Sequence, residues 1–136
     1  MRVVIMGKPF GKQRPKFAYN GTIGYCKAYT PRETKEYEQL VKWEYHRQCG
    51  QYFTDPVRVD IVVKFEILKR TSKADIFKCV NGEIRPAKKP DIDNVVKVLL
   101  DALNTVAFKD DSQVVELHVS KVYSLTPCVE FEVTRV

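Results

Sequence analysis

The sequence predicts an α+β domain of two layers, in which two main helices pack on a mixed β-sheet of about four strands in the order β-α-β-α-β-β. Apolar and polar residues alternate over residues 57–67, 115–119 and 129–133, as in half-buried strands. Apolar residues recur every three or four positions over residues 37–45 and 95–106, as in helices that bury one side. The 136 residues are expected to form a single domain with a core that needs no disulfide.

The first quarter of the chain is predicted to hold a strand, a loop and the start of a helix. Residues 3–6 are a short apolar run bounded by glycine, which is typical of a buried strand. Residues 7–30 contain repeated glycine and proline, so we expect a loop there. Thr30 is the predicted N-cap of the first helix, Pro31 its first residue, and Glu33 the residue that closes a capping box. The apolar stripe of this helix is predicted at Tyr37, Leu40, Val41 and Tyr45.

The middle of the chain leads into a second helix. Gly50 is expected to end the first helix, and the strand of residues 57–67 follows. Residues 68–90 are polar and irregular, which indicates a mobile loop or a short additional element. Pro90 disfavours helix in the residue before it, so the second helix is expected to begin near Asp93 or Asn94. Its buried stripe is predicted at Val95, Val96, Leu99, Leu100, Leu103 and Val106.

The net charge of +6 is concentrated at the N-terminal end. Residues 1–35 contain eight basic residues and one acidic residue, whereas the remaining 101 carry 15 basic and 16 acidic residues. This asymmetry favours a polyanionic partner, with nucleic acid first, and the alternative is a solvated basic loop without a partner. No apolar run approaches the roughly 18 residues that span a membrane, so we expect a cytoplasmic protein without a membrane partner. The four cysteines form no Cys-x-x-Cys pair and are expected to be free thiols, not zinc ligands: Cys26, Cys49, Cys79 and Cys128.

An acidic cluster stands out against this basic background. Asp91 and Asp93 are two residues apart on an extended entry to the second helix, so both side chains are expected to point to one side. Lys97 lies four residues after Asp93, on the same helix face. Asp110 and Asp111 precede a strand that is expected to lie beside this helix, and one of them is predicted to return to the same site.

Carboxylate oxygens suit Mg²⁺ or Mn²⁺. Such an ion lowers the pKa of a bound water and neutralises charge on a phosphodiester, and a nearby lysine such as Lys97 stabilises the developing oxyanion. The alternative is that the acids are only helix caps and turn residues, with Lys97 in a surface ion pair. Spacing alone leaves both interpretations open.

The chain closely resembles the RusA family of small Holliday junction resolvases, which phages and prophages commonly encode. The similar segments are Lys-Pro-Asp-Ile-Asp-Asn-Val-Val-Lys-Val-Leu-Leu-Asp-Ala-Leu-Asn at 89–104, Phe-Lys-Asp-Asp-Ser-Gln-Val-Val-Glu-Leu at 108–117, Lys121, and the basic opening at 7–17 with Tyr-Thr-Pro at 29–31. The resemblance covers most of the chain except about residues 66–88 and the last strand.

This resemblance implies a homodimeric, Mg²⁺-dependent endonuclease that binds four-way junction DNA and introduces paired nicks in strands of like polarity. By the same resemblance, Asp91, Asp93 and Asp111 correspond to the essential acids, Lys97 to the essential lysine, and Asp110 to the neighbouring acid. The expected metal ligands are therefore Asp91, Asp93, Asp111 and Asp110, with Mn²⁺ as a substitute for Mg²⁺.

Charge and loop placement predict the DNA contacts. The residues expected to touch phosphates are Lys8, Lys12, Arg14, Lys16, Lys88 and Lys89. Phe10, Phe17 or Tyr19 is expected either to stack at the opened junction centre or to cover the edge of the core. Two other functions stay open: a non-catalytic module that binds branched DNA, and a nuclease that cuts flaps, forks or plain duplex.

Overall fold

A four-stranded mixed sheet forms the framework of the protein in a computed structural model. The structure describes residues 1–21 and 24–136. The strands lie in the order β1-β6-β4-β5, with bounds Val3–Met6, Cys128–Arg135, Val57–Glu66 and Val114–Ser124. β6 runs antiparallel to both of its neighbours, and β4 runs parallel to β5. The predicted α+β class and element order are confirmed.

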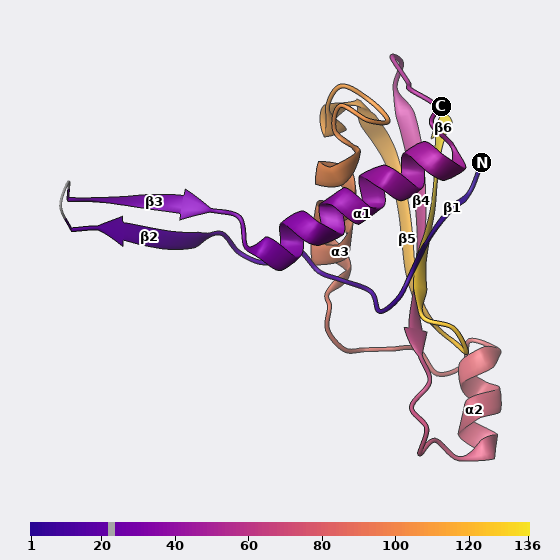
Figure 1. Ribbon diagram of the computed structural model, residues 1–136. Coiled ribbons are helices and arrows are strands. Elements are labelled where there is room, and N and C mark those ends of the chain that lie inside the picture. Colours follow the sequence, from indigo (N-terminus) through magenta and orange to yellow (C-terminus); the bar gives the residue numbers. More distant parts are fainter. Residues whose placement is uncertain (22–23) are drawn as a thin grey trace.

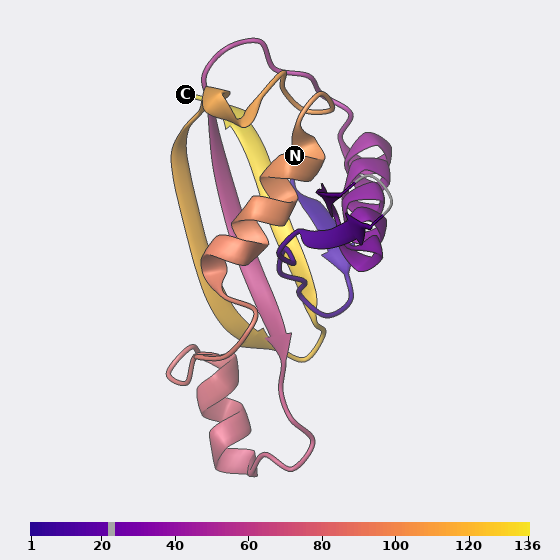
Figure 2. The same ribbon diagram turned by 90° about the vertical axis from the view of Figure 1, so that its left-hand side faces the viewer.

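Two helices cover one face of the sheet, α1 (Arg32–Gln48) and α3 (Ile92–Leu103) (Figures 1 and 2). Their apolar sides meet the alternate residues of β4 that the sequence assigned to the core, and burial of this apolar surface stabilises the two layers. The central side chains of this core are Val41, Tyr45, Val59, Ile61, Val63, Val95, Leu99, Leu103 and Phe131, all at most 1% exposed.

The opposite face of the sheet is polar along β4 and β6, where it carries Arg58, Asp60, Lys64, Glu130 and Glu132. Neither α1 nor α3 covers this face (Figures 1 and 2). Here the alternate residues of β4 form ion pairs along the surface. Arg58 lies 2.8 Å from Asp60, and Lys64 lies 2.7 Å from Glu130 of β6. Because the two faces differ so clearly in polarity, the register of β4 is fixed by burial.

The start of α1 differs from the prediction, whereas its end agrees. Pro31 occupies the N-cap position with no side-chain capping hydrogen bond, so the predicted Thr30 cap and its capping box are wrong. At the other end, Gly50 adopts φ 71°, and its N–H donates to the carbonyl of Tyr45 at 2.8 Å. This left-handed residue ends the helix as expected. Leu40, assigned to the buried stripe, is 42% exposed.

Two small elements lie outside the main layers. β2 (Lys16–Asn20) and β3 (Tyr25–Tyr29) form an antiparallel hairpin that projects from the body (Figure 1), so the prediction of a loop throughout residues 7–30 is wrong. α2 (Lys73–Val80) is the short additional element expected within residues 68–90. Its N-cap Ser72 accepts a hydrogen bond from the backbone N–H of Asp75 at 3.2 Å.

α3 agrees with the prediction more closely than β5 does. α3 begins at Ile92, one residue before the predicted start, and Val95, Leu99 and Leu103 are fully buried as expected. Val98 and Ala102 are also buried, while Val96, Leu100 and Val106 are partly buried. The start of β5 is not buried: Val115 is 57% and Leu117 46% exposed. β5 is an edge strand with β4 as its one neighbour in the sheet, so less of its surface is covered than the alternation predicts.

Candidate functional site

The first turn of α3 presents two exposed carboxylates. Asp91 occupies the N-cap position with φ −69° and ψ 150°, but its side chain makes no capping hydrogen bond. Asp93 follows in the first turn and is also exposed. Within residues 1–21 and 24–136, neither carboxylate forms an ion pair. The positive end of the helix dipole at this N-terminus is a favourable place for their negative charge.

Asp110 is the N-cap and Asp111 the first residue of η1 (Asp111–Gln113), the short 3₁₀ turn that precedes β5. The carboxylate of Asp110 accepts a hydrogen bond from the backbone N–H of Ser112 at 3.1 Å. Hydrogen bonds from the Ser112 side chain and backbone lower the pKa of Asp110, and the charge of Lys97 lowers it further. Asp110 therefore has the local turn role that the alternative interpretation gave it, and Asp111 beside it is half-buried.

The two acidic pairs lie toward opposite ends of α3. η1 leads directly into β5, whose first residue Val114 pairs with Val57 at the start of β4. α3 runs back along the sheet in the opposite direction and reaches this end at its C-terminus (Figure 2). In the described part of the chain, no three Asp, Glu, His or Cys side chains are close enough to share a metal ion. The structure thus does not bring Asp91, Asp93 and Asp111 into one cluster.

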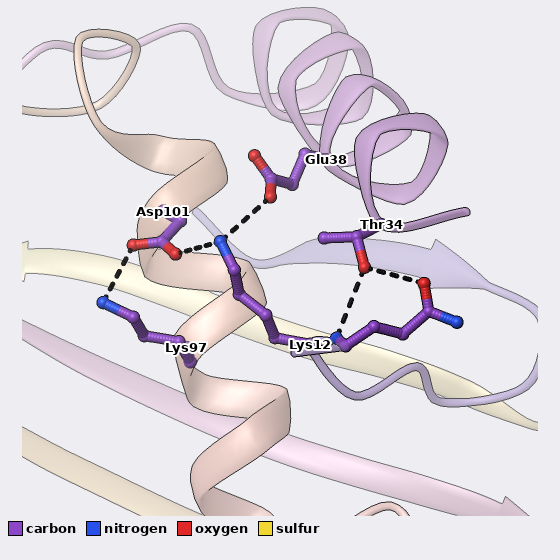
Figure 3. Close-up of polar contacts among 6 residues, drawn as sticks. Lys12, Thr34, Glu38, Lys97 and Asp101 are labelled. Carbon is purple, nitrogen blue, oxygen red and sulfur yellow. Dashed lines mark hydrogen bonds and ion pairs between the residues drawn. The ribbon is translucent and has the colours of Figure 1, made fainter. Parts of the chain in front are cut away.

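Lys97 lies between these pairs and contacts a residue that the sequence prediction missed. Its Nζ is 3.3 Å from Oδ1 of Asp101, one turn further along α3 (Figure 3). The other oxygen of Asp101, Oδ2, is 2.6 Å from Nζ of Lys12. The same Nζ is 3.4 Å from Oε1 of Glu38 on α1. The signal for Asp101 was its four-residue spacing from Lys97, which equals the spacing of Lys97 from Asp93.

The basic N-terminal segment is fixed against both helices. The backbone N–H of Lys12 donates to the carbonyl of Asn94 at 2.9 Å. A Cβ on Gly11 would lie 2.8 Å from Cβ of Pro90, so only glycine allows this approach. On the α1 side, the hydroxyl of the fully buried Thr34 donates to Oε1 of Gln13 at 3.1 Å.

This docking leaves a cavity of about 670 Å³ beside Asp91. Its walls come from the N-terminal segment and from the approach to α3, and it holds three basic side chains as well as one acid. The lining residues are Pro9, Phe10, Gly11, Lys12, Gln13, Arg14, Lys89, Pro90, Asp91 and Asn94. The cleft thus brings one carboxylate next to basic side chains that attract anions.

Comparison with known proteins assigns the family. The family model described as "Endodeoxyribonuclease RusA" matches residues 6–134. The chain belongs to the RusA endodeoxyribonuclease family. It is also 36% identical over 139 residues to the uncharacterized protein YqaN of Bacillus subtilis (strain 168), with all of this chain and 96% of YqaN covered. This RusA-family protein is therefore an enzyme of the endodeoxyribonuclease class, and no helix among its described residues has the length and apolarity to cross a membrane.

Five of the six basic residues predicted to contact DNA are exposed in this RusA-family protein: Lys8, Arg14, Lys16, Lys88 and Lys89. Lys12 differs, because its side chain is only 22% exposed and pairs with two carboxylates. Burial alone would lower the pKa of Lys12, but the hydrogen bonds and charges of Asp101 and Glu38 outweigh it and raise the pKa. Lys12 is therefore held as a cation inside the protein.

The aromatic residues divide between the two roles that the sequence left open. Phe10 stacks on Tyr37 of α1, with ring centroids 5.1 Å apart, and so covers the edge of the core. Phe17 and Tyr19 are 71% and 69% exposed on the projecting hairpin. Their strand partners are Ala28 and Cys26, so this hairpin face presents aromatic rings and small side chains.

Proposed function

We propose that this RusA-family endodeoxyribonuclease is a Mg²⁺-dependent Holliday junction resolvase that acts in DNA recombination and repair. Family membership over residues 6–134 carries the proposal. The exposed acids at the start of α3, next to the basic cleft, support it because they combine groups for a cation with groups for a phosphate.

The donor atoms are of the kind that Mg²⁺ prefers. Asp91 and Asp93 are the proposed ligands from α3, and Asp111 with Asp110 the proposed ligands from η1; all four supply carboxylate oxygens. When bound, Mg²⁺ activates water and neutralises charge on the scissile phosphate, and Mn²⁺ is the expected substitute. The separation of the two pairs along α3 is the feature of the structure that fits one shared ion least well.

The exposed basic residues are proposed to hold the DNA backbone. Lys8, Arg14 and Lys89 lie around the start of α3 and line its two adjoining cavities, while Lys16 begins the hairpin and Lys88 adjoins Lys89. Lys12 is not among the proposed DNA contacts, because its ammonium already pairs with Asp101 and Glu38. Lys97, 60% exposed, is the proposed group that stabilises charge on the reacting phosphate.

A homodimer is the proposed working form because a four-way junction has two equivalent scissile strands. A two-fold protein presents two equivalent sites to them, which allows paired nicks.

The decisive experiment is cleavage of a synthetic immobile four-way junction, mapped on all four strands with Mg²⁺ and with EDTA. We expect symmetric paired nicks with Mg²⁺ only. Asp93→Asn is expected to keep junction binding in a gel-shift assay and to cut at least about 100-fold more slowly, since even outer-shell metal partners often contribute 10- to 100-fold. The matched control is Asp75→Asn on α2, which makes the same change away from α3. Wild-type cleavage by Asp93→Asn would contradict the catalytic assignment.

A second function is favoured by one observation, the absence of a three-carboxylate cluster among residues 1–21 and 24–136. It is a module that binds branched DNA without cutting it. Metal-independent binding with no nicks on any substrate would favour this alternative. Faster cleavage of flaps, forks or plain duplex than of the junction would instead keep the nuclease and change its substrate.

A further inference from the structure

Lys97 has two possible acidic partners at equal spacing on α3. Asp93 lies four residues before it and Asp101 four residues after it. In isolated helices, the pair with the acid N-terminal to the lysine is the more favourable of the two. Intrinsic helix preference therefore favours Asp93, yet the ammonium of Lys97 lies 3.3 Å from Asp101.

The surroundings of Asp101 explain this choice. Its side chain is 18% exposed, and its other oxygen is 2.6 Å from the ammonium of Lys12. Lys12 is itself fixed by Glu38 and by its backbone hydrogen bond to Asn94. An exposed ion pair loses much of its energy because two mobile side chains must be ordered. Because Asp101 is already held by Lys12, only the Lys97 side chain has to be ordered in this pair, whereas Asp93 is exposed and a pair with it would require both side chains to be ordered.

The four charges also balance within this cluster. Lys12 and Lys97 contribute two positive charges, and Glu38 and Asp101 contribute two negative charges. The N-terminal basic segment thus supplies the cation that orders Asp101, and Asp101 in turn orders Lys97 (Figure 3).

We propose that Asp101 is a positioning residue that holds the Lys97 ammonium away from Asp93, so that the Asp93 carboxylate stays open to a divalent cation. This inference rests on the proposed function, in which Asp93 is a metal ligand. Without Asp101, Lys97 turns to Asp93 and competes with the cation for the same oxygens. The Lys97 side chain is 60% exposed, so its ion pair with Asp101 is weak. The ammonium can therefore leave Asp101 and bind a DNA phosphate.

The test is a double-mutant cycle on Mn²⁺ affinity, measured by calorimetry on the metal-free full chain. Asp101→Asn is expected to weaken Mn²⁺ binding about two- to five-fold, the factor that an exposed ion pair at Asp93 is worth. In a Lys97→Met background, the same substitution is expected to have almost no effect, because the competing ammonium is gone. An equal loss in both backgrounds would show that only the charge of Asp101 matters and would overturn the proposal.

Two controls separate positioning from charge. Glu38→Gln removes the same charge next to Lys12 without touching Lys97, so its effect on Mn²⁺ affinity measures the purely electrostatic part. Asp101→Glu retains the charge and is expected to restore most of the Mn²⁺ affinity. A Glu38→Gln loss as large as that of Asp101→Asn would count against positioning.

A second measurement needs no metal. The side-chain resonances of Lys97, assigned by their loss in Lys97→Met, are expected to be unchanged by Asp93→Asn in the otherwise wild-type protein. In the Asp101→Asn background they are expected to shift when Asp93→Asn is added. A shift on Asp93→Asn alone would overturn the proposal even if Asp101→Asn failed to fold. If the resonances behave as expected and wild-type protein binds no Mn²⁺, the proposed metal site fails while the positioning of Lys97 stands.

Discussion

At the scale of single residues, Lys12 joins parts of the protein that are distant in sequence. Its ammonium lies between Glu38 on α1 and Asp101 on α3, and its backbone N–H bonds to Asn94. Half-buried charges are costly to leave unpaired, so each member of this group depends on the others. One lysine therefore couples the packing of the two helices to the placement of Lys97.

Replacing Lys12 is expected to destabilise the protein. Lys12→Met leaves Asp101 and Glu38 without their shared cation, and we expect a loss of about 1–3 kcal/mol in the free energy of unfolding, measured in urea. Lys8→Met is the control, since Lys8 is exposed and forms no ion pair among the described residues. Equal stability of the two variants would contradict the structural role of Lys12.

The raised pKa of Lys12 gives this effect a pH dependence. A folded-state pKa above the unfolded value means that the stabilisation is complete below about pH 10.4, the ordinary lysine value, and is lost as pH rises through the folded-state pKa. The stability difference between wild type and Lys12→Met is therefore expected to be constant from about pH 7 to about pH 9 and to shrink above about pH 10.4. A difference that grows with pH would contradict the assignment.

At the scale of elements, the docking of residues 9–14 on α3 sets the shape of the cleft. Gly11 packs so closely on Pro90 that no side chain fits between them. The cleft beside Asp91 is therefore formed by a contact between two segments nearly 80 residues apart, not by any single loop.

Gly11→Ala tests this contact. The new Cβ would lie 2.8 Å from Cβ of Pro90 and 3.2 Å from Cβ of Asn94, so the segment has to shift. We expect a loss of about 1–3 kcal/mol in unfolding free energy, together with weaker DNA binding. The control is Gly21→Ala, where the added Cβ would lie 3.7 Å from the Tyr19 ring. Wild-type stability of Gly11→Ala would show that the segment is not held where the structure places it.

Periodicity predicted the elements that bury one face, and it failed where burial is small. The alternation of Val57 to Phe65 identified β4 because a central strand between two neighbours expresses its pattern fully. The hairpin of β2 and β3 was missed because it buries little against the body and lies among glycine and proline. Spacing alone could not predict that Lys97 pairs with Asp101 and not with Asp93, since both acids are four residues away and the burial of Asp101 against Lys12 decides between them.

At the scale of the whole molecule, the helical side of the sheet carries the proposed function and the open side does not. The helical side holds the basic segment, the cleft and the acids of α3. On the open side, Arg58 pairs with Asp60 and Glu116, and Lys64 pairs with Glu130, so positive charge there is already neutralised. The exposed basic residues of the cleft, Arg14 and Lys89, therefore lie on the helical side, whereas acidic partners neutralise Arg58 and Lys64 on the open side.

This asymmetry predicts how the salt dependence of DNA binding responds to substitution. Each phosphate contact adds about 0.9 to the negative slope of log affinity against log salt concentration. Arg14→Gln, in the cleft, is expected to weaken junction binding and to reduce that slope by about 1. Arg58→Gln makes the same change on the open side and is expected to leave affinity and slope unchanged. Titrations by fluorescence anisotropy at several salt concentrations measure the affinity and the slope. An equal loss of slope in the two variants would mean that DNA contacts both faces of the sheet, and would contradict this prediction.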